Sequence, residues 1–462
     1  MDNQTYDILK SFAQRDSSVT SLDEIHHWIQ ELNHTTHVEL TKVSLRQCAG
    51  WYMTDDGIIQ NQQGSFFKVA GLCVEKDNKH IMQPIILQNE IGFLGILTKK
   101  INGILHFLMQ AKIEPGNVNK IQISPTLQAT KSNFTLQHGG RRPRYLEFFE
   151  SAGNYKILYD QIQSEQSSRF LGKRNRNIII DVGDEDIQLY KNWKWMTLGQ
   201  IKELLKIDNL VNMDTRTVLS GLPIKVEEAD SCPQFFDPDF FRTLQFSPND
   251  AIAKVYHYIN DFKMFSNLQR NVTSLKTLTG WKCTEDELYC PAGYHFKVVY
   301  YRIEIEGREV KRWAQPLFEA TGMAQFVLLT SIINGKRYFL VHAQFEVGAF
   351  DFMELGPTLQ KEPMEKGKRN SLEEYIATLI KQPKARICRV ILSEEGGRFY
   401  HEQNENIILD ADFDEVEPLR KAQVGYFWMD FSTLLRMLKI NNILNIQLRN
   451  LLTLLDWDGG SI

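Results

Sequence analysis

The sequence predicts an α+β protein that consists of two copies of one domain, each built around a mixed β-sheet. Two observations support this prediction. Short runs rich in β-branched and aromatic residues alternate with few helical segments. Several sequence blocks also recur in the same order about 230 residues apart. A chain of 462 residues is long for a single hydrophobic core, which again favours more than one domain.

The repeated blocks define the expected domain boundaries. Trp51 returns 230 residues later as Trp281, and the strand that ends at Gly116 returns 232 residues later, ending at Gly348. A period of this length is far too long for a solenoid, so it indicates a tandem duplication. We predict an N-terminal copy with a leading helix at 1–222, a phenylalanine-rich connector at 223–245 that docks on one copy, and a C-terminal copy at 246–462.

Several helices can be placed by their capping signals. Ser21, with Glu24 three residues further on, forms a capping box that predicts a helix start. A second capping box opens an amphipathic segment, which predicts a helix over 197–212. In the second copy we expect helices from about Asn249 and over 431–439.

The segment 104–114 is the most informative strand. It alternates with a period of two, and Phe107, Met109, Ala111 and Ile113 share the apolar face. The opposite face carries His106, Leu108, Gln110, Lys112 and Glu114. The simple reading is a solvated outer face, but an idle face seldom gathers an imidazole, an amide, an ammonium group and a carboxylate. We therefore predict a binding or catalytic role for this face.

Composition excludes several classes of function. The formal net charge is −4, which argues against a dedicated nucleic-acid-binding protein. We expect no secretory signal at the N-terminus and no membrane span, because no apolar run approaches the roughly 18 residues that a span needs. The six cysteines form no CxxC pair and none has a nearby histidine at metal-ligand spacing, so we expect reduced, structural cysteines and a cytoplasmic protein.

Long blocks of the sequence resemble the NDP-hexose 2,3-dehydratase family over nearly the full chain. The blocks are QAKIEPGN at 110–117, QISPTLQAT at 122–130 with Ser132 and Asn133, HGG at 138–140, QSE at 163–165, NRN at 175–177, NMDTRTV at 212–218, GREV at 307–310 with Trp313 and QPL at 315–317, and SEEGGRF at 393–399. The resemblance implies two Nudix-like α/β/α modules and a homodimer. It also implies a dTDP-linked 4-keto-6-deoxyhexose as substrate and a downstream 3-ketoreductase that acts on the product.

The reaction of that family sets clear chemical requirements. The C4 ketone acidifies the C3 proton, the resulting enolate expels the C2 hydroxyl, and tautomerisation gives a 3,4-diketo-2,6-dideoxy sugar. Such an elimination needs a base, an electrophile for the enolate oxygen and an acid, and in principle requires no cofactor and no metal. We predict Glu114 as the base, Lys112 as the enolate stabiliser and His106 as the acid or water-positioning group. Alternatively, Glu114 only orders the Pro-Gly turn, or pairs with Lys112 on the surface.

Polar residues in and near the matching blocks are the predicted substrate contacts. These are Gln83, Gln110, Asn117, Gln128, Thr130 and Asn133. Arg141, Arg142 and Arg144 form a natural clamp for a diphosphate, because guanidinium groups bind phosphate oxygens in a bidentate manner. The alternative for these arginines is a solvated basic loop.

The two copies have not kept the same residues. Gln344 stands where the first copy has Lys112, and the Arg-Glu-Val motif at 308–310 has no counterpart in the first copy. Either one active pocket draws residues from both copies, or the pockets have diverged. We favour the first copy as catalytic, with a degenerate second nucleotide-sugar pocket. The residues assigned to that second pocket are Arg308, Trp313, Gln315, His342 and Glu346.

Two other functions compete with dehydration. A Nudix-type nucleotide-sugar phosphohydrolase needs a helix with clustered glutamates that bind a divalent metal, whereas Lys311 and Arg312 follow the Arg308 motif here and the Glu-Glu pair is absent. A catalytically silent nucleotide-sugar-binding protein is the second alternative, because the first copy lacks the motif. Release of water, of nucleotide or of neither distinguishes the three.

Overall fold

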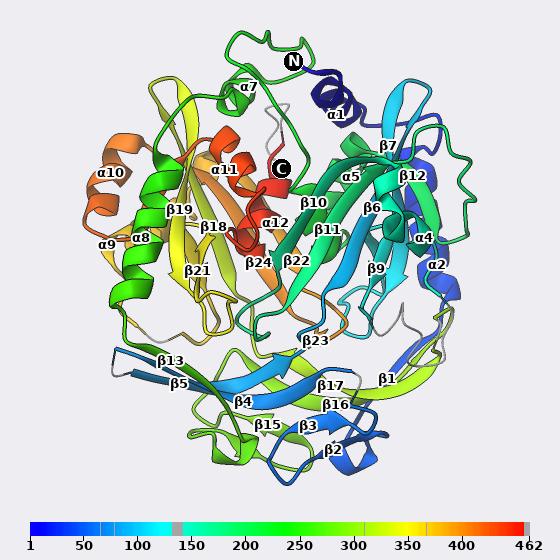
Figure 1. Ribbon diagram of the computed structural model, residues 1–462, viewed down its shortest axis with the longest axis vertical. Helices are drawn as coiled ribbons and strands as arrows, with labels where there is room; N and C mark the ends of the chain where they lie inside the picture. Colours follow the sequence, from blue (N-terminus) through cyan, green and yellow to red (C-terminus); the bar gives the residue numbers. More distant parts are fainter. Residues whose placement is uncertain (65, 78, 132–141, 309, 366, 457–462) are drawn as a thin grey trace.

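The structure, a computed structural model, describes residues 1–64, 66–77, 79–131, 142–308, 310–365 and 367–456. It contains the same arrangement twice: a large sheet of seven strands, with a smaller sheet across one end of it (Figure 1). Both large sheets contain parallel and antiparallel pairs of strands. The predicted α+β class with mixed sheets in two repeats is therefore confirmed.

The large sheet of the first copy has the strand order β10-β11-β6-β7-β12, with β8 beside β7 and β9 beside β6. Its strands are β6 (Gly92–Ile101), β7 (Ile104–Ile113), β8 (Ile121–Ser124), β9 (Leu127–Ala129), β10 (Lys156–Ser164), β11 (Arg174–Asp181) and β12 (Trp193–Thr197). Strand β7 is the alternating segment of the sequence. Both of its faces are largely buried, since Leu108 is as inaccessible as Phe107.

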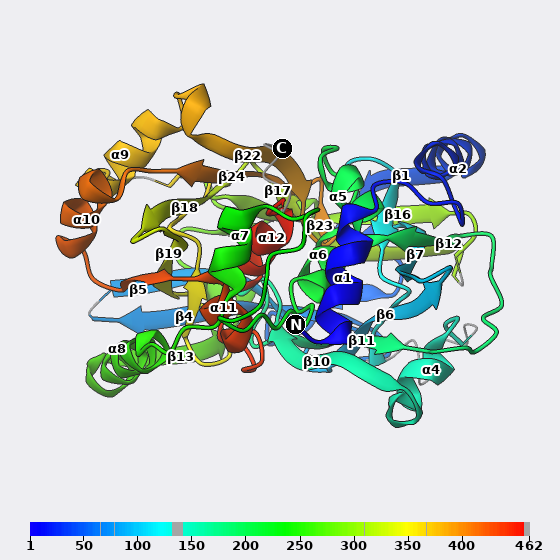
Figure 2. The same ribbon diagram turned by 90° about the horizontal axis from the view of Figure 1, so that it is seen from above.

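The large sheet of the second copy repeats this order as β22-β24-β18-β19-β25, with β20 beside β19 and β21 beside β18. Its strands are β18 (Gln325–Ile333), β19 (Lys336–Phe345), β20 (Met353–Gly356), β21 (Leu359–Lys361), β22 (Arg386–Ser393), β24 (Gln403–Asp410) and β25 (Tyr426–Met429). Strand β19 is thus the counterpart of β7. Figure 2 shows the two large sheets on opposite sides of the molecule.

The two small sheets exchange a strand between the copies. The first consists of β2 (Trp51–Met53), β3 (Ile59–Asn61), β4 (Lys68–Lys76) and β5 (Lys79–Leu87), and is completed by β13 (Leu268–Thr273) of the second copy. The other consists of β14 (Lys282–Cys283), β15 (Glu287–Tyr289), β16 (Phe296–Ile305), β17 (Arg312–Ala320) and β23 (Phe399–Tyr400), and is completed by β1 (Val38–Val43) of the first. The copies are therefore interlocked.

Helices cover the large sheets and fill the space between them. They are α1 (Asn3–Ala13), α2 (Leu22–Thr35), α4 (Leu146–Glu150), α5 (Leu198–Leu205), α6 (Met213–Leu219), α8 (Ala251–Phe265), α9 (Ser371–Leu379), α10 (Phe413–Lys421), α11 (Phe431–Met437) and α12 (Ile446–Leu454). Helices α6 and α12 lie against one another between the copies (Figure 2). No helix in these described ranges is both long and apolar enough to cross a membrane.

The capping predictions are confirmed at the helix starts but one helix end is wrong. The capping boxes at Ser21 and Thr197 are both formed. The helix expected over 197–212 ends at Leu205, however, and Asn212 caps the separate helix α6. Asn209 between them has φ +58°, a left-handed conformation that breaks a continuous helix.

The connector contacts both copies, whereas the sequence predicted docking on one. Its helix α7 (Pro238–Leu244) packs against β19, and the hydroxyl of Thr243 donates a hydrogen bond of 2.6 Å to the carbonyl oxygen of Arg337. The ring of Phe236 lies 6.2 Å from that of Phe12 in α1. The connector thus joins the leading helix to the second copy. The sequence boundaries themselves stay a prediction.

Candidate functional site

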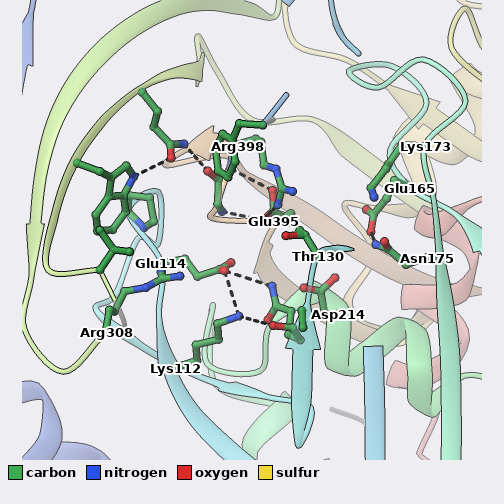
Figure 3. Close-up of a pocket in the computed structure, with 18 of the residues that line it drawn as sticks. Lys112, Glu114, Thr130, Glu165, Lys173, Asn175, Asp214, Arg308, Glu395 and Arg398 are labelled. Atoms are coloured by element: carbon green, nitrogen blue, oxygen red, sulfur yellow. Dashed lines mark hydrogen bonds and ion pairs between the residues drawn. The ribbon is translucent and has the colours of Figure 1, made fainter. Parts of the chain in front are cut away.

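A cavity of about 310 Å³ lies where the large sheet of the first copy meets the small sheet of the second. This volume is at the lower end of the range for small-molecule sites. The first copy contributes Lys112, Glu114, Gln128, Thr130, Lys173 and Asp214 to its wall, and the second contributes Arg308, Trp313, Gln315, Glu395 and Arg398 (Figure 3). We call this cavity the shared pocket.

Lys112 and Glu114 enter the shared pocket from the end of β7. The ammonium group of Lys112 lies 3.4 Å from the Glu114 carboxylate, and it also donates to the backbone carbonyl oxygen of Gln128 at 3.4 Å. The Gln128 amide donates to Glu114 at 3.2 Å and accepts from Asn212 at 3.3 Å. The side chains of Lys112 and Glu114 are only 15% and 9% exposed, so the surface ion pair considered above does not describe them.

The second copy closes the pocket with a chain of side-chain contacts. Arg308 donates a hydrogen bond of 2.8 Å to the carbonyl oxygen of Ile113 and lies over the ring of Trp313. The Trp313 indole donates to Gln315, which in turn donates to the carbonyl oxygen of Gly397 at 2.6 Å. An aromatic ring beside a guanidinium group suits a ligand that has both planar and anionic parts.

Two glycines let the loops of the two copies meet beside Glu114. The amide of Gly116 donates a hydrogen bond of 2.7 Å to the carbonyl oxygen of Gly396. A Cβ atom on Gly116 would lie 1.5 Å from the carbonyl oxygen of Phe399, and one on Gly396 would lie 2.2 Å from Asn117. The Pro-Gly turn therefore joins the copies in addition to reversing the chain.

Cations keep Glu114 ionised. Burial alone would raise its pKa, but the charges of Lys112, Arg308 and Arg398 outweigh burial and hold the pKa below the ordinary value of a glutamate. Arg398 donates to Glu395 at 2.9 Å, which keeps that guanidinium group within the pocket. An ionised carboxylate beside a lysine is a suitable general base.

Other carboxyl groups of the pocket favour the protonated form. Burial and the neighbouring Glu395 raise the pKa of Glu165 to about 7, and burial also raises the pKa of Asp214 well above its ordinary value. Burial lowers the pKa of the Lys173 ammonium group to about 8. The pocket thus combines a carboxyl group whose pKa is lowered with others whose pKa is raised, the separation that acid–base chemistry requires.

The structure does not bring His106 into the shared pocket. Its Nε2 lies 2.9 Å from Ser17 Oγ and its Nδ1 lies 2.9 Å from the carbonyl oxygen of Ile104. It stands six positions before Lys112, a distance of roughly 20 Å along β7. A common face of a long strand does not make a common site, so the predicted acid role of His106 has no support from the shared pocket.

Several predicted substrate contacts also lie elsewhere. Arg142 pairs with Glu150 of α4, and Arg144 stacks over Tyr190, and neither lines the shared pocket, so the diphosphate clamp stays a prediction that this pocket does not support. Gln83, Gln110 and Asn117 are also absent from its wall, whereas Gln128 and Thr130 are part of it. Asn133 and Arg141 lie outside the described residues.

The second-pocket residues fall into two groups. Arg308, Trp313 and Gln315 line the same pocket as Lys112, which corrects their assignment to a second pocket. His342 stacks on the ring of Tyr426, and Glu346 accepts hydrogen bonds from Gln360 and Asn445 within the second copy. The alternative of one pocket that draws residues from both copies is therefore the one that the geometry supports.

Sequence reasoning did not assign five charged residues of the pocket wall to the site. They are Glu165, Lys173, Asp214, Glu395 and Arg398. Four of them lie within the blocks that carry the family resemblance, and Lys173 stands close to one of them. Comparing the charge at equivalent positions of the two copies would have pointed to Lys173 and Asp214.

The described residues also contain one cluster with potential metal ligands. Ligand atoms of Cys73, Glu75 and His80 lie within 4.8 Å of one another on β4 and β5. None of them lines the shared pocket. The sequence showed no cysteine–histidine pair at ligand spacing because strand pairing, not sequence distance, brings these residues together.

The fold and the site define a duplicated protein with a pocket between its two copies, whose wall gathers several buried carboxyl groups and cations. Comparison with known proteins makes this more specific. The family model of NDP-hexose 2,3-dehydratase matches residues 22–222 and 252–455. The chain therefore belongs to the NDP-hexose 2,3-dehydratase family.

Curated relatives span nearly the whole chain. A dTDP-4-dehydro-6-deoxy-alpha-D-glucopyranose 2,3-dehydratase from Streptomyces violaceoruber is 37% identical over 94% of this chain and 97% of its own length. Enzymes with the same name from Saccharopolyspora spinosa and Amycolatopsis orientalis are 34% and 32% identical. They cover 97% and 96% of this chain, and 94% and 92% of their own lengths.

Proposed function

We propose that this protein removes water from a dTDP-linked 4-keto-6-deoxyhexose, with the 4-keto-6-deoxyglucose derivative as the substrate, and forms the 3,4-diketo-2,6-dideoxyhexose nucleotide. Family membership and the names of the relatives support the reaction and the substrate. The single observation that carries the mechanism is the buried pair of Lys112 and Glu114 at the wall of the shared pocket.

In the proposed reaction Glu114 takes the C3 proton. The electron pair of the C3–H bond forms the C3–C4 double bond, and negative charge moves to the C4 oxygen. The Lys112 ammonium group stabilises that charge, which is the electrostatic contribution expected of an enolate site. The enolate then expels the C2 hydroxyl, which takes up one proton and leaves as water, and the enol that remains tautomerises to the diketone.

We assign the nucleotide end of the substrate to the side of the pocket formed by Arg308 and Trp313. The guanidinium group lies over the indole ring, so a phosphate and a planar base could be bound next to each other. The hexose would then reach Lys112 and Asp214, which lie further along the same pocket (Figure 3).

The test is mass spectrometry of the sugar product from wild type, Glu114→Gln and Glu346→Gln. Glu346 is the matched control because it accepts from Gln360 the hydrogen bond that Glu114 accepts from Gln128, and it does not line the shared pocket. We expect diketo product from wild type and from Glu346→Gln, with or without a chelator, and none from Glu114→Gln. The product is trapped by reduction so that slow loss of nucleotide is not mistaken for hydrolysis.

Other outcomes would replace the proposal. Metal-dependent release of nucleotide without loss of water would indicate a phosphohydrolase. Binding of the nucleotide sugar without any turnover would indicate a silent binding protein. Equal activity of Glu114→Gln and wild type would remove Glu114 from the mechanism.

Three finer expectations rest on the resemblance, and a fourth, the cytoplasmic location, rests on the cysteine pattern. We propose that each copy is Nudix-like, that the protein is a cytoplasmic homodimer, and that a 3-ketoreductase acts on the product. Sedimentation equilibrium tests whether the protein is a dimer. Addition of a 3-ketoreductase tests whether such an enzyme consumes the diketone product. Superposition of each copy on a solved Nudix fold tests the ancestry, and fractionation of cells tests the location.

A further inference from the structure

The duplication supplies an internal control for the shared pocket. Each copy contains the same buried frame, in which a glutamine holds a glutamate and an asparagine holds the glutamine. The Gln128–Glu114 and Gln360–Glu346 hydrogen bonds measure 3.2 and 3.1 Å. The corresponding contacts from Asn212 and Asn445 to these glutamines measure 3.3 and 3.0 Å. Only the frame of the first copy lines the shared pocket, so residues that differ between the copies are further candidates for the chemistry of that pocket.

Asp214 is one of the positions where the copies differ. It follows the helix cap Asn212 by two residues, and the residue that follows Asn445 by two is Gln447. The Asp214 side chain lines the shared pocket although the residue is only 2% exposed. Its Oδ1 is buried and has no hydrogen-bond partner within the described part of the chain. A buried carboxyl group without a partner is costly, which indicates a functional role.

The other carboxyl groups of the pocket have structural partners. Glu165 accepts a hydrogen bond from Asn175, and Glu394 accepts the same bond from Asn404 in the second copy, so this pair belongs to the common frame. Glu395 pairs with Arg398. Asp214 is left as the pocket carboxyl group that is specific to this site and aimed at the ligand space (Figure 3).

We propose that Asp214 is the general acid that protonates the departing C2 hydroxyl. This inference rests on the proposed dehydratase function. Glu114 first takes the C3 proton. The C4 carbonyl then re-forms, the C2–C3 double bond forms and the C2–O bond breaks. The departing C2 oxygen takes the proton of Asp214 and leaves as water. The C3 enol then loses its proton and C2 gains one, which returns Glu114 and Asp214 to their starting states. Burial, which raises the pKa of Asp214, keeps the required proton in place.

The experiment separates proton removal from departure of the leaving group. Asp214→Asn is given the 4-keto nucleotide sugar and, in parallel, its 2-deoxy-2-fluoro analogue, from which fluoride leaves without being protonated. We expect formation of the diketone from the hydroxyl substrate to fall about 10²–10⁴-fold, the usual contribution of a general acid. Fluoride release and exchange of the C3 proton with D₂O should stay within a few-fold of wild type. Gln447→Asn is the matched control and should not change any of the three rates.

Each result supports or overturns the role of Asp214. If Asp214→Asn slows fluoride and hydroxyl departure equally, or slows neither, Asp214 is not the acid. If Asp214→Asn does not fold, the rates of hydroxyl and fluoride departure are compared in Asp214→Glu instead. This variant keeps a proton donor, so its rate with the hydroxyl substrate should fall less. Failure of the dehydratase proposal looks different, because wild type would then release neither water nor fluoride.

Discussion

Arg308 of the second copy donates a hydrogen bond of 2.8 Å to the carbonyl oxygen of Ile113 in the first copy. Ile113 immediately precedes Glu114, so this contact fixes the two copies to one another at the predicted base. The Arg308 charge also contributes to the lowered pKa of Glu114, after that of Lys112. One side chain therefore links assembly of the pocket to the ionisation of its carboxylate.

We predict that Arg308→Ala lowers kcat/KM about 10–100-fold, since a charge-assisted contact contributes about 1.5–3 kcal/mol. Because the pKa of Glu114 should rise, the acidic limb of the pH–rate profile should move to higher pH. Arg312→Ala is the control, as Arg312 is exposed, pairs with Glu304 and does not line the shared pocket. An unchanged acidic limb in Arg308→Ala would separate Arg308 from the ionisation of Glu114.

Lys112→Gln places in the first copy the residue that the second copy carries as Gln344. We expect substrate binding to persist and kcat to fall about 10²–10³-fold, the usual cost of losing one stabilising group at an oxyanion. The reciprocal change Gln344→Lys should leave kcat within a few-fold of wild type, because Gln344 lies outside the shared pocket. A variant that loses binding but keeps kcat would show that Lys112 acts as a ligand for the substrate only.

Local features of the fold could be predicted from the sequence. The capping boxes at Ser21 and Thr197 form because their hydrogen bonds connect residues only three positions apart. The alternation over 104–114 identified β7, and it led to Lys112 and Glu114. His106 lies on the same face but in a different environment, since periodicity gives the face of a strand and not the distance to a cavity.

Long-range features could not be predicted in this way. Pairing of β1 with β16 brings Arg308 and Trp313 to the pocket of the other copy, and no local pattern encodes which copy receives an exchanged strand. Asp214 was missed because its chemistry depends on burial by elements far away in the chain. The sequence contained it within a matching block, yet only the fold shows that it faces the ligand space.

The stability of the protein should fall as pH rises from about 4.5 to about 8. Burial raises the pKa of Glu354 to about 8 and that of Glu394 to about 7. The folded state therefore holds protons that the unfolded state has released, and each such group costs up to about 1.4 kcal/mol per pH unit across that window. Thermal unfolding at pH 5 and pH 8 measures this difference.

Glu354→Gln should flatten this dependence and raise Tm at pH 8, with little change at pH 5. The first copy shows that the substitution fits, because Gln122 occupies the position equivalent to Glu354. Gln122 donates a hydrogen bond of 2.7 Å to the hydroxyl of Ser393, whereas Glu354 accepts one from the hydroxyl of Ser164. Glu374→Gln, at an exposed site on α9, is the control. The same slope in Glu354→Gln and wild type would exclude Glu354 as a source of the pH dependence.

The exchanged strands predict that neither half of the chain folds alone. Residues 1–245 would lack β13 on the edge of β4, and residues 246–462 would lack β1 on the edge of β16. Each half would also expose its part of a hydrophobic core that combines Ile25 of α2 with Ile303 of β16. An open sheet edge beside an apolar face promotes aggregation.

We expect each half to be insoluble or to unfold without a cooperative transition, and co-expressed halves to form a one-to-one complex that regains dehydratase activity. A cooperative thermal transition in either isolated half would show that its strands can be completed within one copy.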